Sequence, residues 1–412
     1  MTTQKQNGQR SAAWAGLAAL AGFASLNPAA AGGFRLPDQD AFATARGEAF
    51  VATADNPSAV FYNPAGITQV EGQQFRAGIY GLSLDVRYRS PAGQTFSNRK
   101  DLHAVPQIFY TLNPADSRFS FGFGVYSPMG LSSEWPQDTG FRTLGTRGSV
   151  TYLTLHPVAA WKVAPGLSIA AGPTFNLAEV DLRQGFLTPA AGVGDEFRFK
   201  GNGWDPGFNA GILWNPVTEW QFGLTYKNAT TMDFMGKSTL TSPVFNAQPD
   251  ARTRFVFPQS IAAGISYRPS PKWNLEFDVD WTDWSRLKTL TIQQAPLPDT
   301  GQELHWRSST YFEFGVTRYL DHGWSVSGGY IFNENSLPDN HFSPLVADLN
   351  RHFLSAGAGW KRNNIGVDLA YQFGYGPERS VTGSGVNAFG QSADGRYRFI
   401  SHAILLSLGW HF

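Results

Sequence analysis

Residues 273–281 read Trp-Asn-Leu-Glu-Phe-Asp-Val-Asp-Trp, a strict alternation of apolar and polar side chains. Side chains on a β-strand point to opposite faces in turn, so one face here would be apolar, with Trp273 and Trp281 at its ends. The other face would carry three carboxylates and an asparagine. A soluble sheet could bury the apolar face, and a strand between lipid and a polar lumen would fit the same pattern. The stretch predicts a strand, and the rest of the chain must decide its setting.

The overall composition excludes several classes of protein. The 412 residues include 32 Lys and Arg and 32 Asp and Glu, so the formal net charge is zero and gives no reason to expect nucleic acid as a partner. Cys is absent, which rules out disulfides and a lipoprotein anchor. Beyond the N-terminus no apolar run approaches the ~20 residues that a membrane-spanning helix needs. Membrane strands stay possible, because every second residue of such a strand can be polar.

The first 31 residues are typical of an export signal. Lys5 and Arg10 precede an apolar stretch at residues 12–26, and three alanines at 29–31 supply the small residues of a cleavage site. A single membrane anchor is the alternative, but the apolar run is short for one. We therefore expect residues 1–31 to be a signal peptide and the mature chain to begin near Gly32.

The alternation recurs along nearly the whole mature chain. It is clear at 80–88, 220–227, 365–375 and 400–412, and helical periodicity is weak after the signal. Tight turns rich in Pro, Asp, Asn and Gly alternate with long polar connections, one of them at 293–303. Roughly six short and seven long connections join about 14 strands, and an even count with short turns at one end is typical of outer-membrane barrels.

A soluble β-propeller is the main alternative, but it would show a blade repeat every ~40–50 residues, and we find none. Closure into a barrel removes the exposed edges that so many strands would otherwise create. The chain ends on Trp410-His411-Phe412, which fits a barrel's aromatic girdle as well as ordinary strand packing. We predict an all-β fold, a 14-stranded antiparallel transmembrane β-barrel over residues 73–412, in the outer membrane of a Gram-negative bacterium.

Residues 32–72 do not fit the barrel pattern. They lack the alternation, are rich in Ala, Gly, Asn and Pro, and contain turn formers at 55–57 and 62–66. A periplasmic tail or linker is one interpretation. A plug is the other, because a barrel of this size leaves a wide interior. Apolar residues spread through the segment give it surface with which to dock, so we expect an N-terminal hatch inside the lumen.

Several separated motifs complete the pattern, and together they resemble the long-chain fatty-acid outer-membrane transporter family, FadL/TodX, with OmpP1-like relatives. These motifs are GGFRL at 32–36, NPA at 63–65, FGFGVYSPMG at 121–130, GNGWDPGFNAGIL at 201–213, LTYKNATTMDFMG at 224–236, WTDWSRL at 281–287 and RHFLSAG at 351–357. The resemblance spans essentially all of the mature chain. It implies a 14-stranded barrel closed by an N-terminal hatch, which takes up long-chain fatty acids or aromatic hydrocarbons.

The same resemblance implies two moving parts. The extreme N-terminus acts as a gate that ligand displaces, which points to Phe34, and the hatch carries the motif Asn63, Pro64 and Ala65. A kink in the third strand opens a lateral gap in the wall. That strand would run from about residue 118 to 130, where Gly122, Gly124 and Pro128 are the expected disruptors of pairing.

A fatty acid needs a partner for its carboxylate, which basic lumen side chains supply in the fatty-acid members. The matching stretches suggest Arg183, at the outer end of the fifth strand, and Arg307, at the start of the tenth. Arg grips a carboxylate with two parallel hydrogen bonds. The alternative is that both are rim charges, solvated or paired with Asp181 or Glu303.

For the apolar part of the ligand site, the candidates come from the mature N-terminus and two long loops. Each of them could instead serve only in packing. They are Phe34 and Leu36, Met129 and Leu131, and Phe186 with Leu187.

No other constellation carries chemistry. Glu276, Asp278, Asp280 and Asp283 could suggest a metal or an acid–base pair, but a row of lumen-facing carboxylates is the simpler account. The eight His show no paired metal spacing, and no serine stands in a setting for Ser-His-Asp catalysis. We therefore expect no catalysis, no cofactor and no metal site.

The sequence thus favours passive uptake of hydrophobic molecules, with long-chain fatty acids first and aromatic hydrocarbons as the alternative. A general porin for small hydrophilic solutes and an outer-membrane acyl hydrolase are the competing classes. Besides the ligand, the expected partners are outer-membrane lipid, lipopolysaccharide and the barrel-assembly machinery, and the protein is expected to be a monomer.

Overall fold

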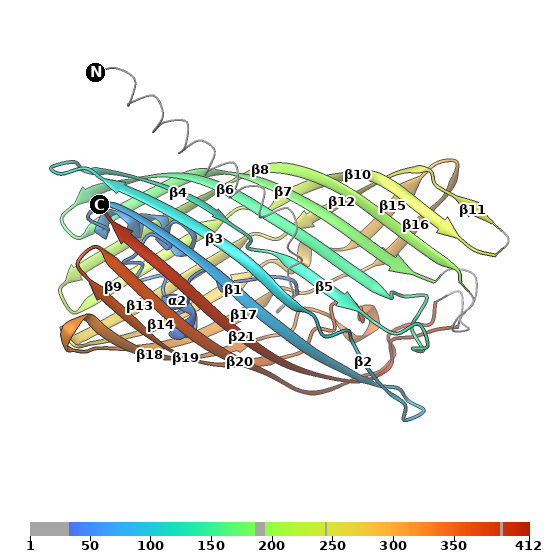
Figure 1. Ribbon diagram of the computed structural model, residues 1–412. Helices are drawn as coiled ribbons and strands as arrows, with labels where there is room; N and C mark the ends of the chain where they lie inside the picture. The colour runs from blue at the N-terminus through green and yellow to red at the C-terminus, as the bar shows by residue number, and fades with distance from the viewer. Residues whose placement is uncertain (1–32, 186–193, 244, 388–389) are drawn as a thin grey trace, which may run out of the picture.

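The computed structural model describes residues 33–185, 194–243, 245–387 and 390–412, which form a closed antiparallel β-barrel (Figure 1). Closure joins the first and last wall strands, which pair from Gln74↔His411 to Arg89↔Arg396. Within the described residues the wall has 14 strands, as predicted. The predicted signal peptide and the ligand candidates Phe186 and Leu187 lie outside the described residues.

Some wall strands consist of two segments, because a turn or an irregular stretch interrupts them. In chain order the wall strands are β1 (Gly72–Arg89), β3 (Leu102–Asn113), β4 with β5 (Phe119–Tyr126, Gly130–Glu134), β6 (Arg147–Ala164), β7 (Leu167–Gln184), β8 (Glu196–Val217), β9 with β10 (Trp220–Lys227, Thr230–Thr241), β12 with β13 (Asp250–Phe257, Ser260–Ser270), β14 with β15 (Trp273–Thr282, Thr289–Gln294), β16 with β17 (Leu297–Glu303, Ser309–Tyr319), β18 (Trp324–Asn333), β19 (Arg351–Arg362), β20 (Ile365–Val381) and β21 (Gly395–His411).

Short elements complete the inventory. Two small strands lie in loops, and the helices are all of six residues or fewer. They are β2 (Thr95–Ser97), β11 (Asn246–Ala247), α2 (Ala41–Ala45), α3 (Ala59–Tyr62), and the 3₁₀ turns η2 (Pro64–Gln69), η3 (Trp284–Arg286), η4 (Asp321–Gly323) and η5 (Asp339–His341). None of the helices in the described ranges has the length and apolar character needed to cross a membrane.

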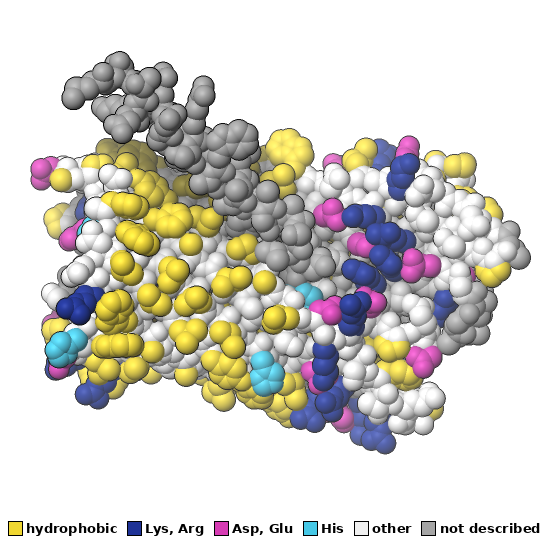
Figure 2. Space-filling model, in the orientation of Figure 1, with side chains coloured by type: hydrophobic (Ala, Val, Ile, Leu, Met, Phe, Trp, Pro, Cys, Tyr) yellow, Lys and Arg dark blue, Asp and Glu magenta, His cyan; other side chains and the backbone are white. Residues whose placement is uncertain are grey.

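The alternation along β14 has the orientation of a membrane strand. Trp273 and Leu275 are exposed on the outer surface, whereas the polar row from Asn274 to Thr282 is buried on the inner side. The same arrangement produces a broad band of hydrophobic side chains on the visible face of the barrel, bordered at one end by a row of charged groups (Figure 2). Lipid therefore replaces solvent as the partner of the apolar face.

The connections follow the predicted alternation in length, with one difference. Tight turns join β6 to β7, β8 to β9, β13 to β14 and β19 to β20 at one end of the barrel. The long polar loop expected at 293–303 is instead the hairpin of β15 and β16, which pair from Thr289↔Glu303 to Gln294↔Leu297. The outer face of this hairpin is polar at Thr289, Thr291 and Gln293, whereas Leu290 and Ile292 face inward, so it lacks the lipid-facing apolar row that marks the other strands.

Residues 33–70, called here the N-terminal segment, are almost wholly buried (Figure 1, dark blue). The helix α2 packs against β18, β19, β20 and β21, and η2 packs against β4, β6, β7 and β8. Asp40 caps α2 by accepting the N–H groups of Phe42 and Ala43. Because these contacts come from separate parts of the wall, the segment lies within the barrel, which is where a hatch would have to be.

Candidate functional site

The acidic row of β14 holds the backbone of the N-terminal segment. The Glu276 carboxylate accepts the N–H groups of Ala52, at 2.7 Å, and Thr53, at 3.1 Å. The Asp278 carboxylate accepts those of Phe50 and Val51, both at 2.8 Å. A segment without regular secondary structure has backbone donors that must find partners when buried. The polar face of residues 273–281 supplies these partners.

Buried ion pairs fix the same segment to the wall. Arg46 pairs with Glu276 at 3.1 Å, with both side chains inaccessible to solvent. Arg35 pairs with Asp280, farther along the polar row of β14. Burial of a charge at this depth is costly unless the charge is paired. The four polar positions of β14 therefore act as a row of attachment points rather than as a metal site.

The motif Asn63-Pro64-Ala65 is a second point of attachment. The Asn63 amide donates to the carbonyl of Val51, at 2.8 Å, and to that of Ile212 on β8, at 2.9 Å. Its side-chain oxygen accepts the N–H of Ala65 and so begins η2. The motif thus ties two parts of the N-terminal segment to one wall strand.

The third wall strand is interrupted between β4 and β5, at residues 127–129. Its backbone groups here bond to the N-terminal segment. The N–H of Leu36 donates to the carbonyl of Pro128, at 2.8 Å, and the N–H of Gly130 donates to that of Phe34, at 2.7 Å. Met129 forms an antiparallel bridge with Arg35 between these two bonds. Residues 34–36 therefore take the place of a neighbouring wall strand.

The expected disruptors differ in what they do. Gly122 and Gly124 are paired on both sides, with Thr111 and Phe109 on β3 and with Val158 and His156 on β6. The prediction that these two glycines break the pairing is therefore wrong. A side chain at either position would meet Val60 of the N-terminal segment, so they are glycines because that segment packs closely there. Pro128, by contrast, lies in the interruption itself.

The interruption leaves a gap in the backbone pairing of the wall beside β3. Pairing of β3 with β4 ends at Ile108↔Val125. Among the residues that the structure describes, 102–107 have no backbone pairing with 127–133. The gap closes again where the N–H of Arg99 donates to the carbonyl of Glu134, at 2.8 Å. On its inner side, the Gln39 amide donates to the carbonyl of Ser127 at 3.0 Å.

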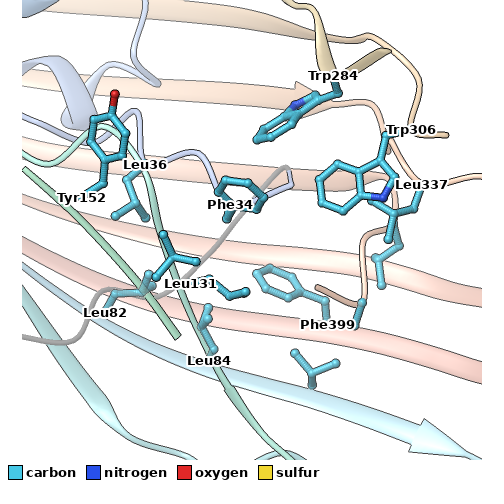
Figure 3. Packing of buried hydrophobic residues seen from close by; sticks show 14 of the residues in the cluster. Phe34, Leu36, Leu82, Leu84, Leu131, Tyr152, Trp284, Trp306, Leu337 and Phe399 are labelled. Carbon is cyan, nitrogen blue, oxygen red and sulfur yellow. The ribbon is translucent and has the colours of Figure 1, made fainter. Parts of the chain in front are cut away.

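Phe34 fills a box of aromatic rings (Figure 3). The ring centroids of Trp284, Phe255, Trp306 and Phe257 lie 4.8, 5.6, 5.8 and 6.0 Å from that of Phe34. Most of these contacts are edge-to-face, the favourable arrangement for aromatic pairs. Within the described part of the chain, the buried indole N–H groups of both tryptophans lack a hydrogen-bond partner. Such unpaired donors are costly, and a ligand oxygen would satisfy them.

Further apolar side chains enclose the opposite side of Phe34. Leu36 and Leu131 are buried in the same cluster, as the close-up shows (Figure 3), and Met129 packs against it. The structure therefore brings four of the sequence-predicted apolar candidates together around the third-strand interruption.

A cavity of about 60 Å³ lies next to this box, and its lining combines apolar side chains such as Met129 and Pro258 with polar and charged groups. Phe257 and Tyr152 line it on one side, with ring centroids 4.7 Å apart, and Phe257 also touches Phe34. Arg35 and Lys227 are the cations in its lining. Hydroxyl and amide groups complete it, from Thr154, Thr174, Asn176, Asn209, Asn228, Thr230 and Ser260.

The two cations of this cavity have different surroundings. The Arg35 guanidinium is bound to Asp280 and to the hydroxyl of Thr282, at 3.0 Å. The Lys227 ammonium stands 3.5 Å from the ring centroid of Phe61, and no carboxylate of the described residues lies within 4.0 Å of it. Lys227 is thus the side chain here whose charge an anionic ligand would balance.

The arginines predicted from sequence lie elsewhere. Arg183 is half-exposed and bound to Asp181 at 3.1 Å, the rim pairing considered above as the alternative. It lines an outer cavity of about 290 Å³ that also contains Phe197, Ile292 and Leu345. Arg307 is exposed, and its backbone N–H donates to the carbonyl of Ser336. Neither arginine lines the inner cavity.

One group of loop residues could hold a metal ion. The ligand atoms of Glu303, His305 and His341 lie within 4.8 Å of one another. Two imidazoles and a carboxylate form a donor set suited to Zn²⁺. No sequence motif pointed to this group, because the two histidines are far apart in the chain and only the loops bring them together.

Lys227 is the functional candidate that sequence reasoning missed. It stands in the motif LTYKNATTMDFMG, on the polar face of the alternation at 220–227. A lone cation on an otherwise neutral inward face was the available signal. The alternation gives the face of each residue, but not its depth in the lumen or its neighbours across it.

One known protein family matches nearly the whole chain. The family profile described as "Outer membrane protein transport protein (OMPP1/FadL/TodX)" matches residues 22–412. This chain belongs to that family. A long-chain fatty acid transport protein of Escherichia coli O6:H1 is 24% identical over 394 residues, covering 84% of this chain and 87% of the relative.

Solved structures of the family share the fold. A FadL homologue of Pseudomonas aeruginosa superposes with a TM-score of 0.82 at 19% identity, covering 92% of this chain and all of the other. The toluene transporter TbuX of Ralstonia pickettii gives 0.72 at 16% identity, with 90% and 98% covered. The chain is therefore an outer-membrane barrel of a Gram-negative bacterium, in a family of transporters of hydrophobic molecules. The identities leave its own substrate open.

Proposed function

We propose that this protein takes up long-chain fatty acids by passive diffusion. The carboxylate pairs with Lys227, the acyl chain enters the space that Phe34 fills, and the ligand leaves sideways through the gap between β3 and β5. In this proposal the N-terminal segment is the hatch, and its extreme N-terminus is the gate. Similarity to a long-chain fatty acid transport protein supports the substrate class.

The observation that carries the proposal is the isolated charge of Lys227. Its ammonium faces a cavity lined by neutral polar groups, aromatic rings and Arg35, which is itself paired with Asp280, and no carboxylate of the described residues lies within 4.0 Å of Lys227. A cation in such surroundings is stabilised by an anion, because charge-assisted hydrogen bonds are strong where water is excluded. A toluene-like substrate would have no use for this charge.

The size of the cavity supports a gate. Pockets that hold small molecules usually measure ~300–1,000 Å³, whereas this cavity measures about 60 Å³. The adjoining space is occupied by the ring of Phe34, whose position depends on the backbone bonds between residues 34–36 and 128–130. Displacement of Phe34 would join the polar cavity to the aromatic box. The same displacement would release the backbone of the third wall strand.

Arg183 fits an earlier step of the same route. It lies in the outer cavity with Phe197, Ile292 and Leu345, so a cation and an apolar surface are combined near the loops. We propose that fatty acids are captured there first, with the carboxylate competing with Asp181 for Arg183. Transfer inward to Lys227 would follow.

Uptake of aromatic hydrocarbons is the second candidate. The box around Phe34 has rings on several sides, and an aromatic ligand could replace the Phe34 ring with little rearrangement. One of the structural neighbours, TbuX, is a toluene transporter. This alternative needs the box alone and not the charge of Lys227.

Ligand binding by the purified full-length protein separates the two. We expect Lys227→Gln to weaken oleate binding by about ten- to a hundredfold, since a hydrogen bond to a charged group contributes ~1.5–3 kcal/mol, and to leave toluene binding unchanged. Lys237→Gln is the matched control, because Lys237 lies on the same wall strand and points outward. Oleate binding that survives Lys227→Gln would remove the basis of the proposal.

The arginines predicted from sequence are tested in the same assay. Arg183→Ala should slow oleate capture while leaving equilibrium binding at the inner site largely intact. Arg307→Ala should have no effect if its exposed side chain plays no part in the route. A loss of equilibrium oleate binding in Arg307→Ala would mean that the site for the ligand carboxylate lies at Arg307, near the loops.

A further inference from the structure

The outer surface of the barrel carries a groove where a second ladder is interrupted. The strand β12 pairs with β15 only at Arg252↔Gln293 and Thr253↔Ile292. The next contact between these neighbouring wall strands is the bond from the N–H of Asp283 to the carbonyl of Gln259, at 3.0 Å. Between these points the chain turns through η3 instead of continuing as a strand. The result is a groove of about 600 Å³.

Four cations line this groove, and they outnumber the carboxylates bound to them. Arg254 pairs with Asp233 at 2.7 Å, and Arg286 pairs with Asp283 at 3.0 Å. Arg252 donates only to the neutral side chain of Gln293, at 2.8 Å. Lys288 is the fourth cation in the lining. Within the described part of the chain, neither Arg252 nor Lys288 has a carboxylate within 4.0 Å.

The groove lies at the edge of the apolar band on the side of the long loops. Met235 pairs with Arg252 in the β10–β12 ladder and is 60% exposed on the outer surface. Val256, two residues after Arg254 on the same strand, adds a second apolar side chain to the lining. On the face visible in Figure 2, Lys and Arg side chains gather along the same edge of the band. Charged lipid headgroups of the outer leaflet meet the protein at this height.

We propose that this groove binds the phosphate groups of lipid A, the phosphorylated glycolipid part of lipopolysaccharide. Arg252 and Lys288 supply the unbalanced positive charge, and Arg254 and Arg286 supply forked donors for phosphate oxygens. The hydroxyl groups of Thr289 and Thr291 add neutral donors in the same lining. The acyl chains would lie along Met235 and Val256. A membrane glycolipid fits better than a soluble anion, because the charged and apolar parts of the groove are continuous.

Titration of the detergent-solubilised full chain tests this proposal, with native mass spectrometry as the readout. The probes are bis-phosphorylated lipid A, the same lipid after dephosphorylation, and inorganic phosphate. The double substitution Arg252→Gln with Lys288→Gln should weaken lipid A binding at least about tenfold, since each removed charge takes away a charge-assisted hydrogen bond. Lys361→Gln with Arg362→Gln is the matched control, because it removes two exposed cations at the opposite end of the barrel.

The unsubstituted protein gives an independent test, should the double variant fail to fold. Binding should favour bis-phosphorylated over dephosphorylated lipid A and should weaken with rising salt, because exposed charges are screened. Equal binding of the two lipids, or equal losses in the double variant and the control, would overturn the proposal. Binding of inorganic phosphate as tight as that of lipid A would reassign the groove to a soluble anion.

Discussion

At the scale of residues, the proposed gate depends most on the ring of Phe34, near the start of the described chain. Phe34 follows Gly33, whose φ of +63° is a left-handed conformation and whose Cα faces the ring of Trp284. This turn directs Phe34 into the aromatic box. Its backbone carbonyl accepts the N–H of Gly130, so the ring in the box and the backbone at the wall gap belong to one residue.

Replacement of Phe34 by alanine tests whether the ring competes with ligand. Removal of a buried Phe side chain costs about 3–5 kcal/mol of local stability, so residues 33–36 should detach more readily. We expect oleate to bind more tightly and ion conductance in planar bilayers to rise. Phe412→Ala is the control, because that ring is exposed at the chain end. Weaker oleate binding at unchanged conductance would mean that Phe34 is a ligand contact and not a gate.

The sequence predicted individual residues unevenly, for physical reasons. Phe34 was singled out through the family resemblance, which implies a gate at the N-terminus; its burial among aromatic rings is observed, and its role as a gate stays a prediction. The carboxylate partner could not be placed, because alternation does not give the neighbours of a cation. Arg183 falls on the face of the exposed Phe175 and Leu177, and Arg307 lies between β16 and β17. Asp181, considered from the sequence as a possible partner, is bound to Arg183 in the fold, whereas Lys227 has no carboxylate of the described residues within 4.0 Å.

At the scale of elements, β14 combines two roles in one alternating sequence. Its apolar row faces lipid, and its polar row receives the N–H groups of residues 50–53 and the guanidinium groups of Arg35 and Arg46. The N-terminal segment has little regular secondary structure, so its position depends on these side chains. One strand thus links the membrane to the contents of the lumen.

Glu276→Gln should loosen this attachment without unfolding the barrel. The substitution leaves Arg46 buried without a full counter-charge, and breaking a buried pair costs about 3–5 kcal/mol, or roughly two to four orders of magnitude in amide exchange. We expect the amides of Ala52 and Thr53 to exchange faster with solvent deuterium. Glu71→Gln, at an exposed position just after the segment, should leave their exchange unchanged. If these amides exchanged only through global unfolding in both variants, the acidic row of β14 would not be what attaches the N-terminal segment to the wall.

The elements were predictable where one face meets lipid and the other meets the lumen. The hairpin of β15 and β16 was missed because its outer face is polar and because β16 contains Pro298, Asp299 and Gly301, which are typical of a loop. The third-strand interruption was expected from Gly122, Gly124 and Pro128; Pro128 lies in it, whereas the two glycines are paired on both sides. Here Val60 packs against both glycines, and the break follows at Ser127, where backbone bonds pass to Gln39.

At the scale of the whole molecule, the N-terminal segment inside the lumen is the feature that distinguishes a transporter with a hatch from an open porin. Removal of residues 33–70 should raise single-channel conductance severalfold, because a barrel of 14 strands then has a water-filled interior. Planar-bilayer recordings of the full and shortened chains measure this difference. Nearly equal conductance would mean that solutes already pass freely around the segment, as in a general porin.

The central claim is that the N-terminus and the third wall strand must separate for ligand to pass, and a reversible cross-link tests it directly. Arg35 and Met129 form an antiparallel bridge, and the hydrogen bonds on either side of it belong to the adjacent residues. In a pair of this type the Cα atoms are about 4.5 Å apart, which is within the range that a disulfide can span. Because the chain has no other cysteine, Arg35→Cys with Met129→Cys would form only this link. Labelled oleate uptake into proteoliposomes should fall to background in the oxidised protein and return on reduction. Equal uptake in the oxidised and reduced states would contradict the claim.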